Sequence, residues 1–216
     1  MLFLAGCNFR CPYCHNPELL QAGDRADNIA WDDLVAYLAE KAGWIDGVSI
    51  TGGEPTIHND LPLLCHRLRE VGMLVKLDSN GSRPGMLEHI ISEGLVDFLA
   101  MDLKTSLARY AEVVRRPVDP EAIKRSIAAI IGSGREHEFR CTVVPGLVGL
   151  DDLESMAKVA EGAQVLVLQQ FRSDNTLDPG YRGAKGYPEE TLLEWADKLS
   201  AIIPTKARGL VSANRD

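Results

Sequence analysis

Short apolar runs alternate with amphipathic helical patterns along the whole chain, and this alternation constrains the fold more than any other feature. The segments between the runs place apolar residues three and four positions apart, as a helix with one buried face does. Strands that alternate with helices form a parallel sheet through right-handed crossovers. The sequence therefore predicts an α/β protein with six strand–helix units, whose apolar runs lie at residues 2–5, 48–50, 73–77, 95–101, 139–144 and 165–168.

The expected helices have recognisable ends. The patterns of residues 31–42, 61–71 and 120–131 are each followed by a glycine, and Pro84 and Pro188 begin two further helices. Six units fit either an open doubly wound sheet or an incomplete barrel, and periodicity does not separate the two. In both architectures, functional residues gather at the carboxyl ends of the strands.

Length and composition indicate one domain over residues 1–216. The chain has 216 residues, of which 45% are hydrophobic and 25% charged, and no change in composition marks a boundary. Residues 172–187, rich in Gly and Asp, are expected to form a long mobile loop.

Charge and cysteine usage exclude several classes of function. A formal charge of −8 argues against nucleic acid or an anionic membrane as a partner, and no stretch approaches the ~20 apolar residues of a membrane span. The five cysteines form no disulfide pattern, so we expect a reducing, cytoplasmic environment. Cys65 and Cys141 fall on apolar faces and are expected in the core.

Cys7, Cys11 and Cys14 crowd into eight residues near the start of the chain. Cys11 and Cys14 match a glutaredoxin-type dithiol, but that fold is smaller and leaves Cys7 without a role. Cys11 to His15 match a haem attachment pattern, which requires export. A structural zinc site with His15 is strained, because Cys14 and His15 are adjacent. The reading we favour is an iron–sulfur cubane on three thiolates, which leaves one iron open to bind substrate.

The spacing C-x3-C-x2-C, followed by Gly-Gly-Glu at a strand end, resembles the radical S-adenosylmethionine (SAM) superfamily. Within it, several segments resemble the activating enzymes of anaerobic ribonucleotide reductase, and the pyruvate formate-lyase activating enzyme shares some of them. They occur in order along essentially the whole chain: CNFRCPYCHNPEL, TGGEPT, LDSNG, MDLK, FRCTVVPG and LQQF.

The resemblance implies a partial (βα)6 TIM-like barrel of the radical SAM type, a [4Fe-4S] cluster, and SAM bound at its open iron. It assigns the cluster to Cys7, Cys11 and Cys14. The residues that it places around SAM, some of them near a monovalent cation, are Tyr13, Gly52, Gly53, Glu54, Asp78, Ser79, Asp102, Lys104 and Arg140.

Plainer interpretations of these residues stay open. Gly-Gly-Glu fits a simple strand-to-helix turn, Tyr13 fits loop packing, and Asp102 with Lys104 fits a surface ion pair. An inward-facing Arg140 needs a buried anionic partner, which the carboxylate of SAM would supply.

The resemblance also implies the reaction. One electron from a flavodoxin- or ferredoxin-like donor cleaves SAM, and the resulting 5′-deoxyadenosyl radical takes hydrogen from a glycine of a partner enzyme. Such chemistry requires no general acid or base, so we expect no catalytic side chain. Arg172 stands where the formate-lyase activator has a histidine, which argues against pyruvate formate-lyase as the partner. The motif set implies anaerobic ribonucleotide reductase as the partner instead.

The start of the chain departs from the family pattern. The chain begins inside its first expected strand, whereas members of the family carry residues upstream, so we expect a shortened N-terminal edge. The alternatives are an activator of another glycyl radical enzyme, a small-molecule radical SAM enzyme such as a deazapurine synthase, and a zinc-binding interaction module.

Overall fold

The computed structural model describes residues 1–20 and 28–210, and its framework is one parallel sheet. The sheet runs in chain order through β1 (Leu2–Leu4), β2 (Gly47–Gly52), β3 (Leu74–Ser79), β4 (Phe98–Asp102), β5 (Glu136–Val143), β6 (Leu166–Gln170) and β7 (Thr205–Arg208). A doubly wound sheet reverses its strand order at a switch point, and this sheet does not. The expected partial barrel is therefore confirmed, and the barrel is left open between β1 and β7.

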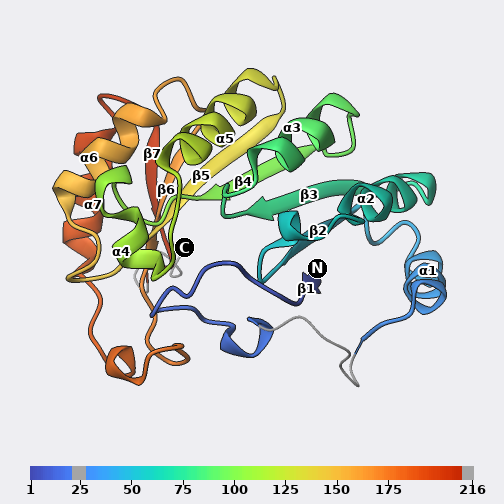
Figure 1. Cartoon of the computed structure of the whole chain (residues 1–216), viewed down its shortest axis with the longest axis horizontal. Coiled ribbons are helices and arrows are strands. Elements are labelled where there is room, and N and C mark those ends of the chain that lie inside the picture. Colours follow the sequence, from blue (N-terminus) through green and yellow to red (C-terminus); the bar gives the residue numbers. More distant parts are fainter. Residues whose placement is uncertain (21–27, 211–216) are drawn as a thin grey trace.

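The helices lie mainly along the outer face of the curved sheet. Figure 1 shows α2, α3, α5, α6 and α7 on this face, while the segment that follows β1 crosses the opposite, concave face. The helices are α1 (Trp31–Glu40), α2 (Leu61–Glu70), α3 (Pro84–Ser92), α4 (Tyr110–Val114), α5 (Pro120–Gly132), α6 (Leu150–Val159) and α7 (Glu189–Leu199). Short 3-10 turns are η1 (Pro17–Leu19), η2 (Pro55–Ile57), η3 (Leu107–Arg109) and η4 (Pro179–Tyr181).

Strand β5 shows how the two faces of the sheet differ. Phe139, Cys141 and Val143 are at most 1% exposed and belong to the core beneath the helices. Because side chains alternate along a strand, Arg140 and Thr142 point to the concave side. The helical face therefore holds the hydrophobic core, and the concave face carries polar chemistry.

Strand β7 was not among the expected strands. Its residues Thr205, Lys206, Ala207 and Arg208 contain no apolar run. They pair in parallel with β6 at the edge of the sheet. An edge strand with charged positions gives no hydrophobic signal in the sequence.

The helix expected over residues 120–131 and the core positions expected for two cysteines are confirmed. The Asp119 side chain accepts a hydrogen bond from the backbone N–H of Glu121, and Pro120 opens the helix. Cys65 and Cys141 are 0% and 1% exposed, as their apolar surroundings predict.

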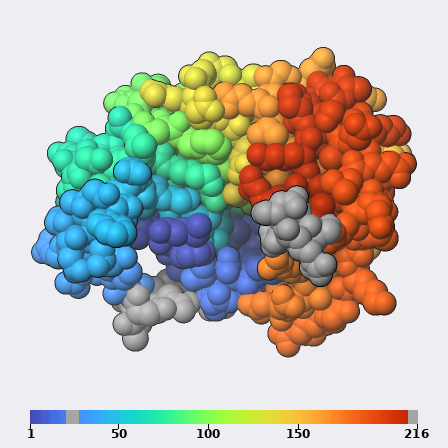
Figure 2. Space-filling model, turned by 180° about the vertical axis from the view of Figure 1, so that it is seen from behind, coloured from blue at the N-terminus to red at the C-terminus, as the bar shows by residue number. Residues whose placement is uncertain are grey.

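The long loop that precedes α7 lies against the segment that follows β1. Leu177 N–H donates to the Cys14 carbonyl at 3.1 Å, and Asp178 N–H donates to the Pro12 carbonyl at 2.9 Å. In Figure 2 the orange loop and the blue N-terminal segment lie side by side on one surface. Across residues 1–20 and 28–210, no helix is long and apolar enough to cross a membrane.

Candidate functional site

Cys7, Cys11 and Cys14 lie on the loop that follows β1, which we call the cysteine loop (residues 7–16). None of the three is in a disulfide, and Cys11 is 8% exposed. The loop is anchored at Arg10, whose backbone N–H donates to the Val114 carbonyl at 2.9 Å. All three cysteines line one cavity of about 200 Å3 at the carboxyl ends of the central strands.

The cavity brings together most of the residues that the sequence singled out. Arg140 is the one predicted residue absent from its lining. The predicted residues that line the cavity are Cys7, Cys11, Tyr13, Cys14, Gly52, Gly53, Glu54, Asp78, Ser79, Asp102 and Lys104.

Gly52 and Gly53 are required because the backbone of β1 and of Gly6, just before the cysteine loop, packs directly on them. Gly52 has φ of +119°, and a Cβ atom there would lie 2.4 Å from the Leu4 carbonyl oxygen. A Cβ atom on Gly53 would lie 2.0 Å from the Gly6 carbonyl oxygen. The backbone that approaches these glycines is thus that of the chain itself, a role distinct from the close approach of a ligand.

The Glu54 carboxylate is buried and joins the turn after β2 to the end of β3. Its Oε1 accepts hydrogen bonds from the backbone N–H and hydroxyl of Thr56 and from the Ser79 hydroxyl at 2.8 Å. Its Oε2 accepts one bond, from the Asn80 N–H at 2.6 Å. Burial raises the pKa of Glu54 despite these bonds. A carboxylate offers about four acceptor positions, so Oε2 retains one for a ligand.

Asn8 and Asn80 belong to the site although the sequence did not single them out. The Asn80 side chain donates to the Asn8 side-chain oxygen at 3.0 Å, and Asn8 donates to the Ser82 hydroxyl at 2.8 Å. The bonds tie the cysteine loop to the turn after β3. The available signal was Asn in the turn sequence LDSNG, since such residues bond locally at strand ends.

A network of charges fills the concave face beneath the cavity. Arg140 donates through Nε to Asp102 at 2.9 Å and through Nη1 to Asp78 at 3.0 Å. The Nζ atoms of Lys104 and Lys76 lie 3.2 Å from Asp102 and 2.7 Å from Asp78, respectively. The anionic partners that Arg140 requires are therefore these two side chains, supplied by the protein itself.

These ion pairs determine the protonation of Asp102. Burial raises the pKa of the Asp102 carboxyl, but Lys104 and Arg140 outweigh that effect and hold the pKa well below its usual range. Both Asp78 and Asp102 already pair with a cationic side chain of the protein. The arrangement gives no support to the expected monovalent cation.

Tyr13 carries a polar atom that the described residues leave unsatisfied. The side chain is 4% exposed, and its hydroxyl finds no hydrogen-bond partner within residues 1–20 and 28–210. Burial raises its pKa well above the usual value. A buried hydroxyl without a partner is costly, and its place in the cavity lining fits a ligand that would satisfy it.

The donor set fits a cluster better than a single ion. No three His, Cys, Asp or Glu side chains of the described part of the chain are arranged to hold one metal ion. In an iron–sulfur cluster each thiolate binds its own iron, so three cysteines around a shared cavity suffice. Burial raises the pKa of Cys7, and that of Cys11 to about 11. Metal binding therefore requires these thiols to lose protons.

Comparison with known proteins agrees with this geometry. Residues 1–160 match the family model described as Radical SAM superfamily. A Methanocaldococcus jannaschii protein named "Putative glycyl-radical enzyme activating enzyme MJ1227" is 32% identical over 207 residues, which span 93% of this chain and 83% of the relative. The 7-carboxy-7-deazaguanine synthase of Aquifex aeolicus is 35% identical over 81 residues, which span 37% of this chain and 34% of the synthase.

Solved structures share the fold at low sequence identity. The Streptococcus suis protein SuiB bound to S-adenosylmethionine superposes with a TM-score of 0.72 at 16% identity, over 95% of this chain and 48% of SuiB. The Escherichia coli coproporphyrinogen III oxidase HemN gives 0.65 at 16% identity, over 93% of this chain and 50% of HemN. The chain thus spans about half the length of these two structures.

Proposed function

Because the chain belongs to the radical SAM superfamily, we propose that it activates a glycyl radical enzyme, with anaerobic ribonucleotide reductase as the partner. The family implies a [4Fe-4S] cluster and SAM as cofactors. When bound, this pair supplies one-electron cleavage of the SAM sulfonium and so a radical that abstracts hydrogen. The residues of this chain bind, orient and shield that chemistry.

One observation carries the proposal: three unbridged cysteines share a cavity with a buried carboxylate and a lysine. Cys7, Cys11 and Cys14 would hold the cluster, and Glu54 and Lys104 face the same space. The free acceptor position of Glu54 Oε2 suits an ammonium group, and Lys104 Nζ suits a carboxylate. The two charged ends of an amino acid such as the methionine part of SAM are thus matched.

Arg140 has a different part in this proposal. It lies behind the lining and bridges Asp78 and Asp102, so it positions these carboxylates at the cavity floor. Asp102 in turn holds Lys104 Nζ at 3.2 Å. Arg140 therefore acts on a carboxylate ligand indirectly, by positioning Asp102, which in turn holds Lys104. In the bonds described, Nη2 is the only nitrogen of its guanidinium group that remains free to contact a ligand directly.

The extent of similarity favours an activase over small-molecule chemistry. The activating-enzyme relative aligns with 93% of the chain, whereas the deazaguanine synthase aligns with 37%. A second M. jannaschii protein named as a glycyl-radical enzyme activating enzyme aligns with 73%. The motifs TGGEPT, LDSNG and MDLK, which resemble the reductase activators, support the choice of partner.

Anaerobic incubation of the reconstituted protein with SAM, a reductant and anaerobic ribonucleotide reductase tests the proposal. We expect a glycyl doublet in the electron paramagnetic resonance spectrum of the reductase, and none with the Cys11→Ala variant. SAM cleavage without a doublet would refute this partner while leaving the radical SAM chemistry intact. A doublet on pyruvate formate-lyase, with none on the reductase, would identify pyruvate formate-lyase as the partner in place of the reductase.

A further inference from the structure

Two segments cover the outer side of the cysteine loop, away from the cavity. One ends α4, where Val114 accepts the Arg10 N–H at 2.9 Å. The other belongs to the loop before α7, where Asn175 donates through its side chain to the His15 carbonyl at 2.7 Å, and Leu177 and Asp178 bond to the loop backbone. The residues beside these contacts therefore lie next to the cysteine loop on this side.

Arginines gather on these two segments and on the loop. We call them the arginine face: Arg10, Arg115, Arg116 and Arg172. Arg10 Nη1 donates to the Cys7 carbonyl at 2.6 Å, which places a guanidinium directly on the loop. The Arg115 side chain is 48% exposed, and Arg116 and Arg172 are exposed. In a chain of net charge −8, this is a local concentration of cations.

The carboxylates near the arginine face do not cancel it. Asp178 is bound by Arg115 at 2.6 Å, and Asp119 faces the start of α5, where it caps the helix. Asp174 is exposed beside Arg172. Because Asp178 pairs with Arg115, three arginines of the face, Arg10, Arg116 and Arg172, are left without an ion pair among the described residues.

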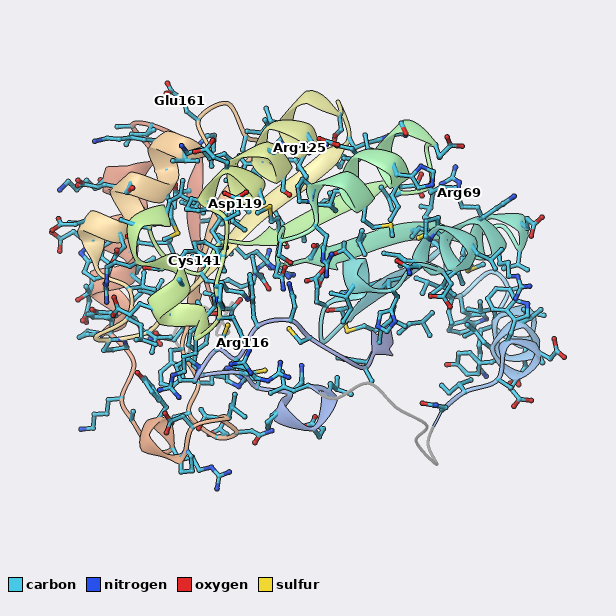
Figure 3. All side chains as sticks on the ribbon, in the orientation of Figure 1. Arg69, Arg116, Asp119, Arg125, Cys141 and Glu161 are labelled. Carbon is cyan, nitrogen blue, oxygen red and sulfur yellow. The ribbon has the colours of Figure 1, made fainter. Side chains whose placement is uncertain are left out.

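Other arginines of the chain behave differently. Arg69 and Arg125 lie on the helical face in Figure 3, where Arg69 pairs with Asp97 and Arg125 with Glu88. Arg116 lies on the opposite side in Figure 3, beside the N-terminal segment. Within the described residues Arg116 makes no ion pair, and its guanidinium donates only to the Arg115 carbonyl. Its charge is thus available to a partner.

The backbone at Arg115 supports a role for this surface. Arg115 has φ of +52°, a conformation that ordinarily favours glycine at the end of a helix. It is the only non-glycine residue with positive φ in the described chain. A strained backbone at a functional surface is a recognised use of such outliers.

We propose that the arginine face docks an acidic protein that carries one electron to the cysteine site. The proposal rests on the proposed function, because only a site that cleaves SAM reductively needs that electron. The cavity side must stay open for SAM and for the radical acceptor, so the electron enters from the outer side. In the transfer the donor is oxidised by one electron and the cluster is reduced by one, and no bond forms or breaks.

Charge complementarity explains why an acidic donor would dock at the arginine face and not elsewhere on the chain. The chain as a whole is acidic and repels an acidic donor, whereas the arginines of the face that have no ion pair attract it in one orientation. Electrostatic steering of this kind raises association rates about 10- to 1000-fold and weakens with salt. Docking therefore depends on ionic strength, and reduction by a small inorganic reductant does not depend on the arginines.

The test compares Arg116→Glu with Lys158→Glu in the reconstituted protein. Both positions are exposed and both changes alter the net charge equally, but Lys158 lies on α6. The probe is an acidic flavodoxin in its hydroquinone form, and the readouts are its dissociation constant and the rate of cluster bleaching by absorbance. At low salt we expect Arg116→Glu to raise the dissociation constant and to lower the bleaching rate, each by about tenfold. Lys158→Glu should match the wild type in both, and Arg116→Lys should restore both values.

Dithionite separates this proposal from the proposed function. With dithionite, Arg116→Glu should cleave SAM at the wild-type rate. Absence of SAM cleavage in the wild type would refute the proposed function, yet docking would still be measured by bleaching. Equal behaviour of Arg116→Glu and Lys158→Glu toward flavodoxin would overturn the docking proposal. The docking proposal would also be overturned if Arg116→Glu failed to transfer the radical when dithionite supplies the electron. The arginine face would then bind the radical acceptor and not the electron donor.

Discussion

The side-chain amide of Asn80 donates a 3.0 Å hydrogen bond to the side-chain oxygen of Asn8, across 72 residues of sequence. The backbone N–H of the same Asn80 bonds to Glu54 Oε2 at 2.6 Å. One residue therefore holds both the cysteine loop and the buried carboxylate. The spacing between the cluster site and the Glu54 subsite depends on it.

Replacing Asn8 tests this link. Asn8→Ala removes the bonds to Asn80 and Ser82. We expect the free energy of unfolding to fall by about 1 kcal/mol and the protein to retain less iron after reconstitution. Asn8→Asp should restore iron content, because a carboxylate accepts from Asn80 and from the Ser82 hydroxyl. Iron per protein and thermal unfolding measure the two effects. Unchanged iron content in Asn8→Ala would show that the loop is positioned without this link.

Gly53→Ala should damage the fold itself. Its Cβ atom would meet the Gly6 carbonyl oxygen at 2.0 Å and the Leu19 carbonyl oxygen at 3.1 Å, both backbone atoms that cannot rotate away. We expect a loss of about 1–3 kcal/mol in the free energy of unfolding. The matched control is Gly85→Ala in α3, where nothing lies within 4 Å and a gain of about 0.4–1 kcal/mol is expected. Denaturant unfolding compares them, and equal effects would contradict the packing described.

Arg140→Leu should leave Asp78 and Asp102 short of their shared cation. Removing one partner of a buried ion pair costs about 3–5 kcal/mol, and we expect a loss toward that range in denaturant unfolding. Adding Asp78→Asn to this variant should recover part of the loss, because it removes one of the two carboxylates that lost their bond to Arg140. Failure of the second change to recover any stability would argue that Arg140 acts by packing alone.

Asp152 links the loop after β4 to the start of α6 and makes stability depend on pH. It accepts bonds from Ser106, from the Gly149 N–H at 3.1 Å and from Arg109 at 2.9 Å. Burial raises the pKa of the Asp152 carboxyl, but these bonds outweigh it and the pKa lies below its usual value. We expect Asp152→Asn to cost about 1–2 kcal/mol at pH 7.

The sign of that pH dependence follows from the lowered pKa. The stabilisation is present in full above the unfolded pKa near 3.9 and is lost as the pH falls through the lower folded pKa. Unfolding curves of wild type and Asp152→Asn should therefore converge in acid. A difference that stays constant from pH 7 to acid would contradict the assignment.

The sequence predicted most strands and helices well because they carry strong periodic signals, whereas the choice of a partial barrel came from the family resemblance. The apolar runs correspond to β1 to β6, and α5 begins and ends at the expected Pro120 and Gly132. Strand β7 escaped prediction because its charged residues lie on an edge. Local patterns thus reveal elements that bury an apolar face, and they miss elements that depend on a neighbour.

The resemblance assigned Glu54 and the cysteines to one site, and the structure places them around one cavity. The bonds that connect the residues of this cavity were not predicted. The pairing of Arg140 with Asp78 and Asp102 depends on the register of three strands, and the link between Asn8 and Asn80 depends on two loops meeting. Such contacts between distant residues leave no periodic trace in a single sequence.

The most direct measurement is the resonance spectrum of the reduced, reconstituted protein with and without SAM. We predict an iron–sulfur signal that needs Cys7, Cys11 and Cys14 and that shifts when SAM is added, because SAM would bind at the iron for which these three cysteines supply no ligand. A spectrum unchanged by SAM, or a protein that binds one zinc ion and no iron, would contradict it.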